Sequence, residues 1–236
     1  MQLEVLQRSK GDGISEDSPP GELIDWMLAR FSGQRMLMTT AFGMEGCALI
    51  DMVARRALAF KVVYIDTAFL FPETLDLKDR LAARYPNLEF IGVHPLTPED
   101  QAAEYGDKLW ERNPDLCCRL RKVEPMHEVM KDVDVWVAGL RRSQSDTRGR
   151  IQVVEWNWQY QVVKISPLAA WDRKQVWAYV QEHEVPYNPL HEHGYPSIGC
   201  THCTQPVAGA DVTTYSREGR WNGREKTECG LHGYGI

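Results

Sequence analysis

The sequence predicts an open, doubly wound α/β sheet with helices on both faces and a cysteine-bearing C-terminal tail. Two observations lead to this prediction. Short apolar runs alternate with amphipathic stretches between residues 35 and 184, and beyond about residue 185 this periodicity gives way to Pro, Gly, His and aromatic residues. Strands that alternate with helices form parallel sheets. We therefore expect a loose N-terminus over 1–20, an α/β domain over 21–210 and a mobile tail over 211–236.

The expected elements follow in order along the chain. Helical spacing of apolar residues over 21–31 predicts a helix that caps the domain. Strands are expected over 36–42, 60–66, 88–93, 133–140 and 161–168. Helices are expected between and after these strands, over 45–58, 72–85, 98–105, 119–132 and 171–184.

Composition and charge narrow the class of protein. A chain of 236 residues is long enough for one sizeable core. Its net charge of −6 argues against a general nucleic-acid binder, which uses an excess of Lys and Arg to displace counterions from phosphates. The first residues lack a basic segment followed by an apolar run, and no stretch approaches the roughly 20 apolar residues of a membrane helix. We expect a cytoplasmic homo-oligomer without nucleic-acid or membrane partners.

The turn after the first expected strand is a candidate anion site. Residues 39–46 read Thr-Thr-Ala-Phe-Gly-Met-Glu-Gly and run directly into a helix. Backbone N–H groups at such a helix start can bind phosphate, and Gly43 and Gly46 allow close approach. Neither the Rossmann glycine pattern nor the Walker pattern is present, so an ordinary strand-to-helix turn is the alternative interpretation.

Two further segments reach the same edge of the expected sheet. Asp66 and Thr67 follow the second strand, and ligands bind parallel sheets at the carboxyl ends of their strands. Residues 139–150, just past another strand, contain Arg141, Arg142, Arg148 and Arg150. Forked guanidinium groups in this place indicate a small anionic ligand. The alternatives are a helix-entry role for Asp66 and a solvated loop over 139–150.

Four of the six cysteines come in two pairs, Cys117–Cys118 and Cys200-x-x-Cys203. In a reducing cytosol such groups indicate metal binding or redox chemistry rather than disulfides. Four thiolates suit either tetrahedral zinc or an iron-sulfur cluster. Because the side chains of adjacent cysteines diverge, they chelate one small ion poorly, and the spacing favours the cluster over zinc.

The other two cysteines differ in their surroundings. Cys229 lies between Glu228 and Gly230 in a polar tail, where packing gives no reason for a cysteine. Exposure and nearby cations make such a thiol reactive. Cys47 lies on an apolar helix face, and we expect it in the core.

Taken together, these motifs resemble the sulfonucleotide reductases, which reduce adenylyl sulfate (APS) or its 3'-phosphorylated form (PAPS) to sulfite with thioredoxin. The resemblance extends from about Arg35 to His232 and depends on CCRLRKVEP, GLRRSQS, a GCxxC pair, REGRW and ECGLH, in this order. It implies an adenine nucleotide alpha hydrolase-like sheet. It also implies that the Cys229 thiolate attacks the substrate sulfur, expels AMP and leaves a cysteine S-sulfonate, from which a thioredoxin thiol releases sulfite.

The resemblance extends to the other site residues. A 4Fe-4S cluster would be held by Cys117, Cys118, Cys200 and Cys203. Lys122 would link cluster and substrate, the phosphosulfate would lie near Arg148, Arg217 and Arg220, and His232 belongs to the tail motif. The expected nucleotide contacts are Thr40, Phe42, Gly43, Asp66, Thr67, Gly139 and Arg148.

The four paired cysteines favour APS as the substrate, because typical PAPS enzymes of the family keep only the tail cysteine. The chain departs from the family pattern at two positions. Gly46 replaces an acid in the phosphate turn, so that Thr40 must supply any hydroxyl, and Gln205 replaces an arginine after Cys203. The alternatives are a PAPS or dual-specificity reductase, an ATP-dependent tRNA sulfur-insertion enzyme and a zinc-stapled binding module. The lack of a Ser-Gly-Gly-x-Asp-Ser turn counts against the tRNA enzyme.

Overall fold

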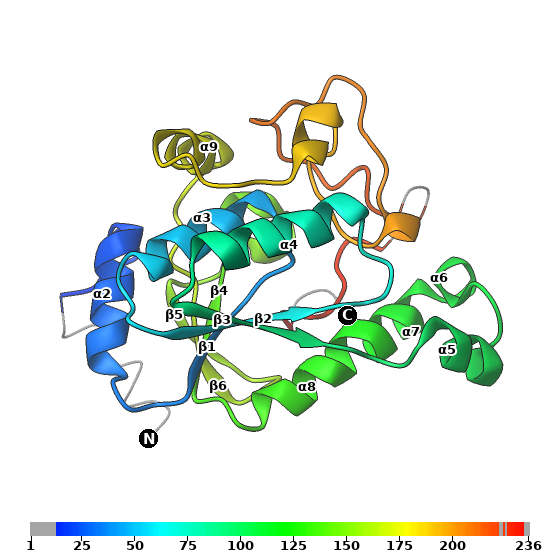
Figure 1. Cartoon of the computed structure of the whole chain (residues 1–236), viewed down its shortest axis with the longest axis horizontal. Coiled ribbons are helices and arrows are strands. Elements are labelled where there is room, and N and C mark those ends of the chain that lie inside the picture. The colour runs from blue at the N-terminus through cyan, green and yellow to red at the C-terminus, as the bar shows by residue number, and fades with distance from the viewer. Residues whose placement is uncertain (1–12, 222–223, 225, 234–236) are drawn as a thin grey trace.

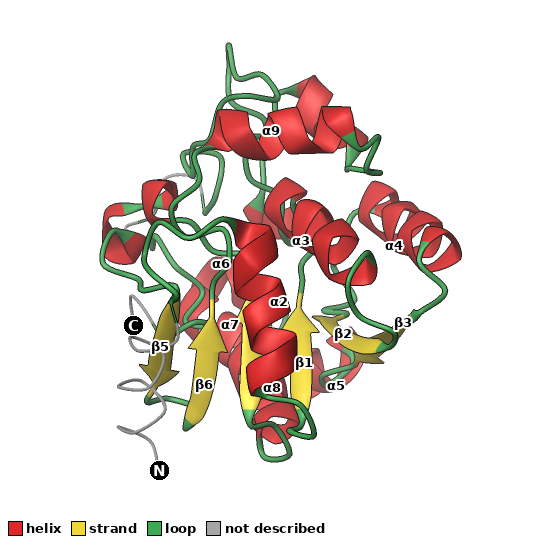
Figure 2. Cartoon of the chain, turned by 90° about the vertical axis from the view of Figure 1, so that its left-hand side faces the viewer, coloured by secondary structure: helices red, strands yellow, loops and turns green. Residues whose placement is uncertain are grey.

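The computed structural model of the protein describes residues 13–221, 224 and 226–233. Its centre is a six-stranded sheet in the order β3-β2-β1-β4-β6-β5 (Figures 1 and 2). The strands are β1 (Met36–Thr39), β2 (Phe60–Ile65), β3 (Leu88–Val93), β4 (Val135–Ala138), β5 (Val154–Asn157) and β6 (Val162–Ile165). All neighbours pair in parallel except β5 and β6, which are antiparallel. The prediction of a doubly wound α/β sheet is confirmed.

Helices cover both faces of the sheet. Figure 1 shows α3 and α4 above the strands, α8 below them, and α9 stacked outside α3. The helices are α2 (Pro20–Arg30), α3 (Met44–Ala54), α4 (Pro72–Arg84), α5 (Pro98–Tyr105), α6 (Leu109–Arg112), α7 (Pro114–Cys118), α8 (Glu124–Met130) and α9 (Arg173–Glu182). A proline opens α2, α4 and α5, where its missing N–H costs nothing. A capping box between Asp172 and Gln175 opens α9.

Some elements differ from the sequence prediction. The sequence pattern does not predict the short helix α6 or β5, a four-residue edge strand whose Glu155 and Trp156 are only half-buried and give it no continuous apolar pattern. The helix expected over 119–132 begins earlier, as α7, and passes through a π-helical turn, Arg119–Val123, before α8. Such π turns interrupt regular helices mostly at functional sites.

The order of the strands places a crevice between β1 and β4. The chain builds β2 and β3 on one side of β1 and then returns to build β4 on the other side. At this switch point the connections leave β1 and β4 in opposite directions, and ligands of open α/β sheets bind outside the carboxyl ends there. Thr40, Asp66 and Gly139 directly follow β1, β2 and β4 and therefore lie at this edge.

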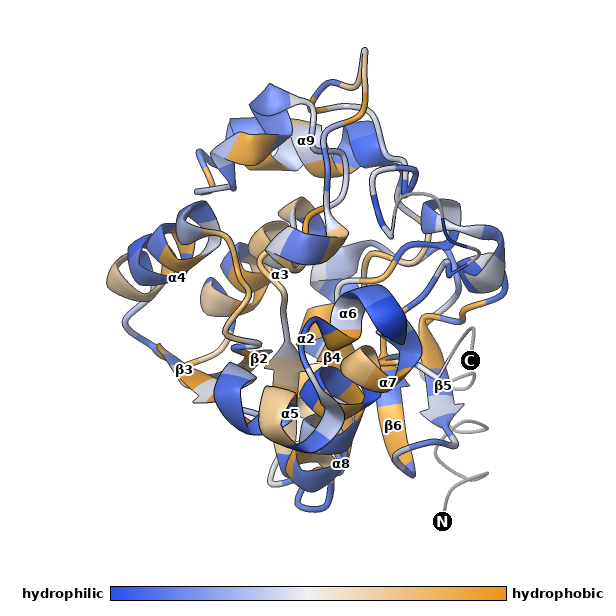
Figure 3. Ribbon diagram, turned by 90° about the vertical axis from the view of Figure 1, so that its right-hand side faces the viewer, coloured by the Kyte–Doolittle hydropathy of each residue, from blue (hydrophilic) through white to orange (hydrophobic). Residues whose placement is uncertain are grey.

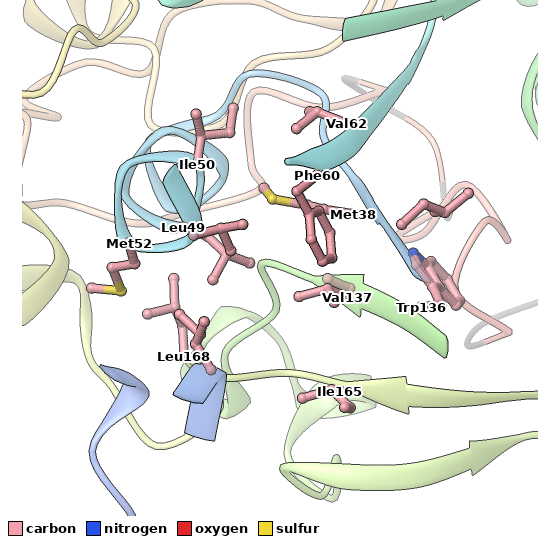
Figure 4. Close-up of a cluster of buried hydrophobic side chains, with 14 of the residues drawn as sticks. Met38, Leu49, Ile50, Met52, Phe60, Val62, Trp136, Val137, Ile165 and Leu168 are labelled. Carbon is pink, nitrogen blue, oxygen red and sulfur yellow. The ribbon is translucent and has the colours of Figure 1, made fainter. Parts of the chain in front are cut away.

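The core packs against both faces of the sheet, with α3 on one face and α8 on the other. Figure 4 shows part of it, including Met38, Leu49, Ile50, Met52, Phe60, Val62, Trp136, Val137, Ile165 and Leu168. Met38 and Val137 are register partners in β1 and β4, and both are fully buried. In Figure 3, β6 is largely hydrophobic whereas α9 alternates, as expected of a buried strand and a surface helix.

Cys47 is fully buried on α3, so the prediction that it belongs to the core is confirmed. Burial of a side chain of this kind contributes stability through the hydrophobic effect, and it also keeps the thiol away from the reactive surface. Within the described part of the chain, no helix has the length and apolar character needed to cross a membrane.

Candidate active site

A cavity of about 210 Å³ opens at the carboxyl edge of the sheet, at the switch point. Its wall combines the turns after β1, β2 and β4 with the C-terminal segment. Most of the residues that the sequence analysis singled out line it: Thr40, Gly43, Thr67, Gly139, Lys122, Arg148, Cys200, Arg217, Arg220, Cys229 and His232. Tertiary structure thus brings residues from both ends of the chain to one concave surface, as expected of a ligand site.

The turn after β1 forms one wall of the cavity. Gly43 is the N-cap of α3, an 11-residue helix whose first N–H groups point towards this edge. The Thr40 hydroxyl accepts a hydrogen bond from the Phe42 N–H at 2.9 Å. A Cβ at position 46 would lie 2.4 Å from that hydroxyl oxygen, so Gly46 leaves the space that the Thr40 hydroxyl occupies. The absence of a side chain at Gly46 therefore accommodates the Thr40 hydroxyl.

Two predicted nucleotide contacts lie off the cavity wall. Phe42 has φ = 56° and turns its ring into the core, where it packs against Tyr64 and Phe90. The Asp66 carboxylate accepts a hydrogen bond from the Ala68 N–H at 2.9 Å and closes a local turn. Both side chains shape the loops that border the cavity rather than its surface.

A buried carboxylate that the sequence analysis did not single out lies on the wall beside the phosphate turn. Glu45 receives hydrogen bonds from Nε and Nη2 of Arg141, at 3.0 and 2.8 Å, and from Nη1 of Arg173 at 3.0 Å. Burial raises the pKa of Glu45, but the two guanidinium groups outweigh it and hold the pKa at about 2. The triad joins α3, the loop after β4 and α9. The only sequence signal for it was Arg141 in the arginine-rich loop.

His191 completes this buried group. It is only 2 % exposed, and its Nδ1 lies 2.7 Å from the Tyr195 carbonyl oxygen, which requires the proton on Nδ1. Burial and the neighbouring Arg173 lower its pKa to about 4, so the ring is neutral at physiological pH.

The four paired cysteines gather at one end of the cavity, around a second, small void. That void is bordered by Cys117, Cys118, Cys200, Cys203, Lys122, Arg121 and the rings of Phe69, Trp110 and His202. Lys122 and Cys200 border both spaces, so they form the partition between the cysteines and the main cavity. Among the described residues, no three His, Cys, Asp or Glu side chains converge as ligands of a single metal ion.

The donors beside the cysteines fit an anionic group with several acceptor atoms. Arg121 is only 1 % exposed, and its Nη1 donates to the Thr67 carbonyl at 2.7 Å. Its Nε and Nη2 are buried without a hydrogen-bond partner in the part of the chain that the structure describes. Buried donors normally have acceptors. Four thiolates and these donors suit the sulfur atoms of an iron-sulfur cluster.

The two residues of the partition shift each other's pKa values. Burial lowers the pKa of Lys122, but the neighbouring thiols of Cys200, Cys118 and Cys229 outweigh it and raise the pKa above its ordinary value. The reverse holds for Cys200: burial raises its pKa, while Lys122 and the Thr67 hydroxyl bring it below the ordinary value. Burial raises the pKa of Cys117 to about 12. Lys122 thus lies close to thiols of both the cysteine group and the tail.

The tail residue before Cys229 is a buried carboxylate. Glu228 is 3 % exposed and forms a two-pronged ion pair with Arg148, Nε to Oε1 at 2.9 Å and Nη2 to Oε2 at 2.8 Å. Arg217 approaches Oε2 at 3.3 Å, and the Ser145 hydroxyl donates to Oε1 at 3.1 Å. Two of the three arginines predicted near the phosphosulfate, Arg148 from the α/β domain and Arg217 from the tail itself, therefore contact Glu228.

The third arginine, Arg220, holds the cysteine loop. Its Nε donates to the Cys203 carbonyl at 3.2 Å, and its Nη1 donates to the Ser197 hydroxyl at 3.3 Å. A Cβ at position 199 would lie 2.2 Å from Arg220 Nη2, so Gly199 is required for the guanidinium group to lie there.

His232 lies flat against the sheet. Its ring stacks on Trp136 at 5.1 Å with an interplanar angle of 6°, and Trp136 in turn donates to the Thr39 hydroxyl at 2.7 Å. Burial lowers the pKa of His232 well below its ordinary value, and nearby Lys164 adds to the effect. A neutral ring is therefore stacked against the end of β1.

The fold and site define a class, the adenine nucleotide alpha hydrolase-like α/β proteins, here with a thiol on a docked C-terminal segment. Yeast FAD synthetase has the same fold, with a TM-score of 0.55 at 14% identity over 83% of this chain and 71% of its own. Residues 35–206 match the phosphoadenosine phosphosulfate reductase domain, and the chain belongs to this family of sulfur oxidoreductases.

The curated relatives carry two different names. This chain is 48% identical to a phosphoadenosine 5'-phosphosulfate reductase of Gloeobacter violaceus, over 92% of this chain and 90% of that protein. It is 45% identical to an adenosine 5'-phosphosulfate reductase of Salinibacter ruber, over 92% and 85% of the two chains. A phosphoadenylyl-sulfate reductase of Candida auris, solved with phosphate, superposes with a TM-score of 0.74 at 33% identity, over 88% of this chain and 98% of that one.

Proposed function

We propose that the protein is a thioredoxin-dependent APS reductase of sulfate assimilation, which converts APS to sulfite and AMP. The observation that carries the proposal is that Cys229 borders the same switch-point cavity as Lys122 and Cys200. A nucleotide at the carboxyl edge of the sheet would present its sulfate to these groups. The relatives named adenosine 5'-phosphosulfate reductase support the choice of substrate.

The reaction needs one enzyme thiol and two electrons from thioredoxin. The Cys229 thiolate attacks the sulfate sulfur of APS, the bond from sulfur to the bridging oxygen breaks, and AMP leaves with that electron pair. A thioredoxin thiolate then attacks the Cys229 sulfur, and sulfite leaves with the electron pair of the S–S bond. The second thioredoxin thiol frees Cys229, and thioredoxin ends as a disulfide.

Cations at the cavity wall would stabilise the phosphosulfate as charge builds up on the leaving phosphate. Lys122 lies between the cysteine group and Cys229, and Arg220 lies on the same wall. Fixed cations in a partly dry cavity stabilise developing negative charge far better than water does.

The four paired cysteines would hold a 4Fe-4S cluster, with the unpartnered donors of Arg121 supporting this assignment. When bound, the cluster would supply anionic sulfur atoms beside Arg121 and Lys122 and fix the orientation of both side chains. Anaerobically purified protein should be brown and contain iron and sulfide. Colourless, zinc-loaded protein would contradict the cluster and favour zinc.

The test of the reaction is a single-turnover experiment with radiolabelled APS and no thioredoxin. We expect label bound covalently to Cys229, released as sulfite when thioredoxin is added. Cys229→Ser should abolish both labelling and sulfite release while AMP still binds. Cys47→Ala, which changes a buried thiol outside the cavity, is the matched control and should label normally. Substantial turnover by the Cys229→Ser variant would refute the mechanism.

A PAPS reductase is the second candidate, because the Gloeobacter violaceus relative carries that name. The ratio of kcat/KM for APS and PAPS separates the candidates. We expect a clear preference for APS. A preference for PAPS would reassign the substrate without changing the chemistry at Cys229.

A further inference from the structure

The described part of the tail is docked along its length, with Cys229 between two anchors. On one side, Glu228 is bound by Arg148 and Arg217. On the other side, the carbonyl oxygens of Gly230, Leu231 and His232 accept hydrogen bonds from the last residue of β5 and the turn that follows it. The donors are Gln159 at 3.4 Å, Tyr160 at 2.9 Å and Asn157 at 3.4 Å.

These contacts differ in how strongly each can hold the tail. The two bonds at 3.4 Å are long, and the bond from Tyr160 is a single hydroxyl-to-carbonyl contact. Lys226 pairs with Asp115, but Asp115 is 76% exposed, and exposed ion pairs contribute little. The Glu228–Arg148 pair is buried on both sides, at 4% and 7% exposure of the side chains. Charge-assisted two-pronged contacts of this kind are the strong ones.

We infer that Glu228 is a positioning residue: its ion pair with Arg148 docks the tail and holds Cys229 at the cavity. Arg148 is well placed for this role because its remaining terminal nitrogen, Nη1, donates to the Gln144 side chain at 2.5 Å. Each guanidinium nitrogen of Arg148 therefore has a fixed acceptor, and the acceptors lie on the loop after β4 and on the tail. The pair links the nucleophile to the α/β body.

In the docked state, every side-chain nitrogen of Arg148 already donates a hydrogen bond. Its nitrogens donate to Glu228 and Gln144, and the other cations of the cavity wall are Lys122, Arg217 and Arg220. The inference depends on the proposed function only for its rate measurement, because tail docking can be observed without any substrate.

The first measurement is limited trypsin digestion of the purified, cluster-loaded protein. Cleavage after Lys226 reports undocking, because the Lys226 side chain is only 9% exposed when docked. Glu228→Gln removes the negative charge of the ion pair with Arg148 and should increase the rate of cleavage after Lys226 by about tenfold or more. The control, Glu218→Gln, changes an exposed acid in the same segment and should cleave like the wild type.

The second measurement is the single-turnover rate of S-sulfonate formation on Cys229. Glu228→Gln should slow it by about tenfold or more, with the AMP dissociation constant changed by less than about twofold. Arg148→Lys keeps the positive charge but cannot make the two-pronged contact with Glu228. It should likewise slow S-sulfonate formation and leave the AMP dissociation constant nearly unchanged. Glu228→Asp should restore part of the rate.

Two results would overturn the inference. Unchanged trypsin cleavage in Glu228→Gln, with an unchanged melting temperature, would show that the Glu228–Arg148 ion pair does not hold the tail. Tighter AMP binding without slower chemistry would make Glu228 a competitor of the ligand anion instead. If wild-type protein forms no S-sulfonate with APS or PAPS, the proposed function fails, and the digestion still decides whether Glu228 docks the tail.

Discussion

Two buried carboxylates, Glu45 and Glu228, are each bound by two arginines, but they have different structural roles. Glu45 pairs with Arg141 and Arg173, both from the α/β body. Glu228 pairs with Arg148 and Arg217, and it belongs to the C-terminal tail itself. The two groups use the same chemistry and have similarly low exposure, but one joins elements of the core and the other joins a terminal segment to it.

The difference shows that connectivity decides what a buried ion pair does. Breaking the Glu45 group leaves buried charges that the body can only expose by unfolding. Breaking the Glu228 group lets a terminal segment swing out, so that its charges reach water while the core stays folded. We therefore expect the first group to govern global stability and the second to govern the position of Cys229.

The largest expected effect follows from breaking the scaffold group. Glu45→Gln leaves Arg141 and Arg173 buried at 1% and 5% side-chain exposure without a countercharge. Removal of one partner of such a group costs about 3–5 kcal/mol. We expect this loss in the free energy of unfolding measured with urea. A loss below about 1 kcal/mol would mean that the triad is solvated and not part of the scaffold.

The next effect is a dependence of stability on pH through His191, which contacts Arg173 of the same group. Its pKa falls from 6.5 to about 4 in the folded state, so between these values the unfolded chain binds a proton that the folded chain does not. Stability should therefore be full above pH 6.5 and fall as the pH drops towards 4, by about 3 kcal/mol. His191→Asn should flatten this slope, and unfolding curves across the range would contradict the assignment if the slope persisted.

A smaller effect tests the packing of the phosphate turn beside Glu45. Gly46→Ala places a Cβ 2.4 Å from the Thr40 hydroxyl and should cost about 1–3 kcal/mol of unfolding free energy. Thr40→Ala removes that oxygen, so the double variant should be more stable than the sum of the single losses implies. Strict additivity in this cycle would show that the two side chains do not share the space.

The smallest effect on stability is expected in the tail. Glu228→Gln should lower the free energy of unfolding by less than about 1 kcal/mol, because the tail can undock without unfolding the core. Urea titration of this variant beside Glu45→Gln compares the two carboxylates directly. Equal losses in the two variants would remove the distinction between scaffold and tail.

Sequence periodicity was sufficient for most of the regular elements of the fold. Apolar runs such as 133–140 and 161–168 predicted β4 and β6, because strands buried in a parallel sheet need nearly continuous apolar residues. The pattern missed β5, whose half-buried face carries Glu155 and Trp156. It also missed the π turn at Arg119–Val123, since a local change in hydrogen-bond register leaves no mark on hydrophobic spacing.

By itself, the sequence determined which residues are candidates for reactive chemistry: the paired cysteines, the basic residues after Cys118 and the tail thiol are visible as types and spacings. Only the tertiary structure decided how they are arranged. It turned Phe42 into the core, gave Lys122 its place between two groups of thiols, and paired Arg148 with Glu228 instead of leaving it to a ligand. The physical reason is that side-chain chemistry is local, whereas burial and charge pairing depend on which distant segments the sheet brings together.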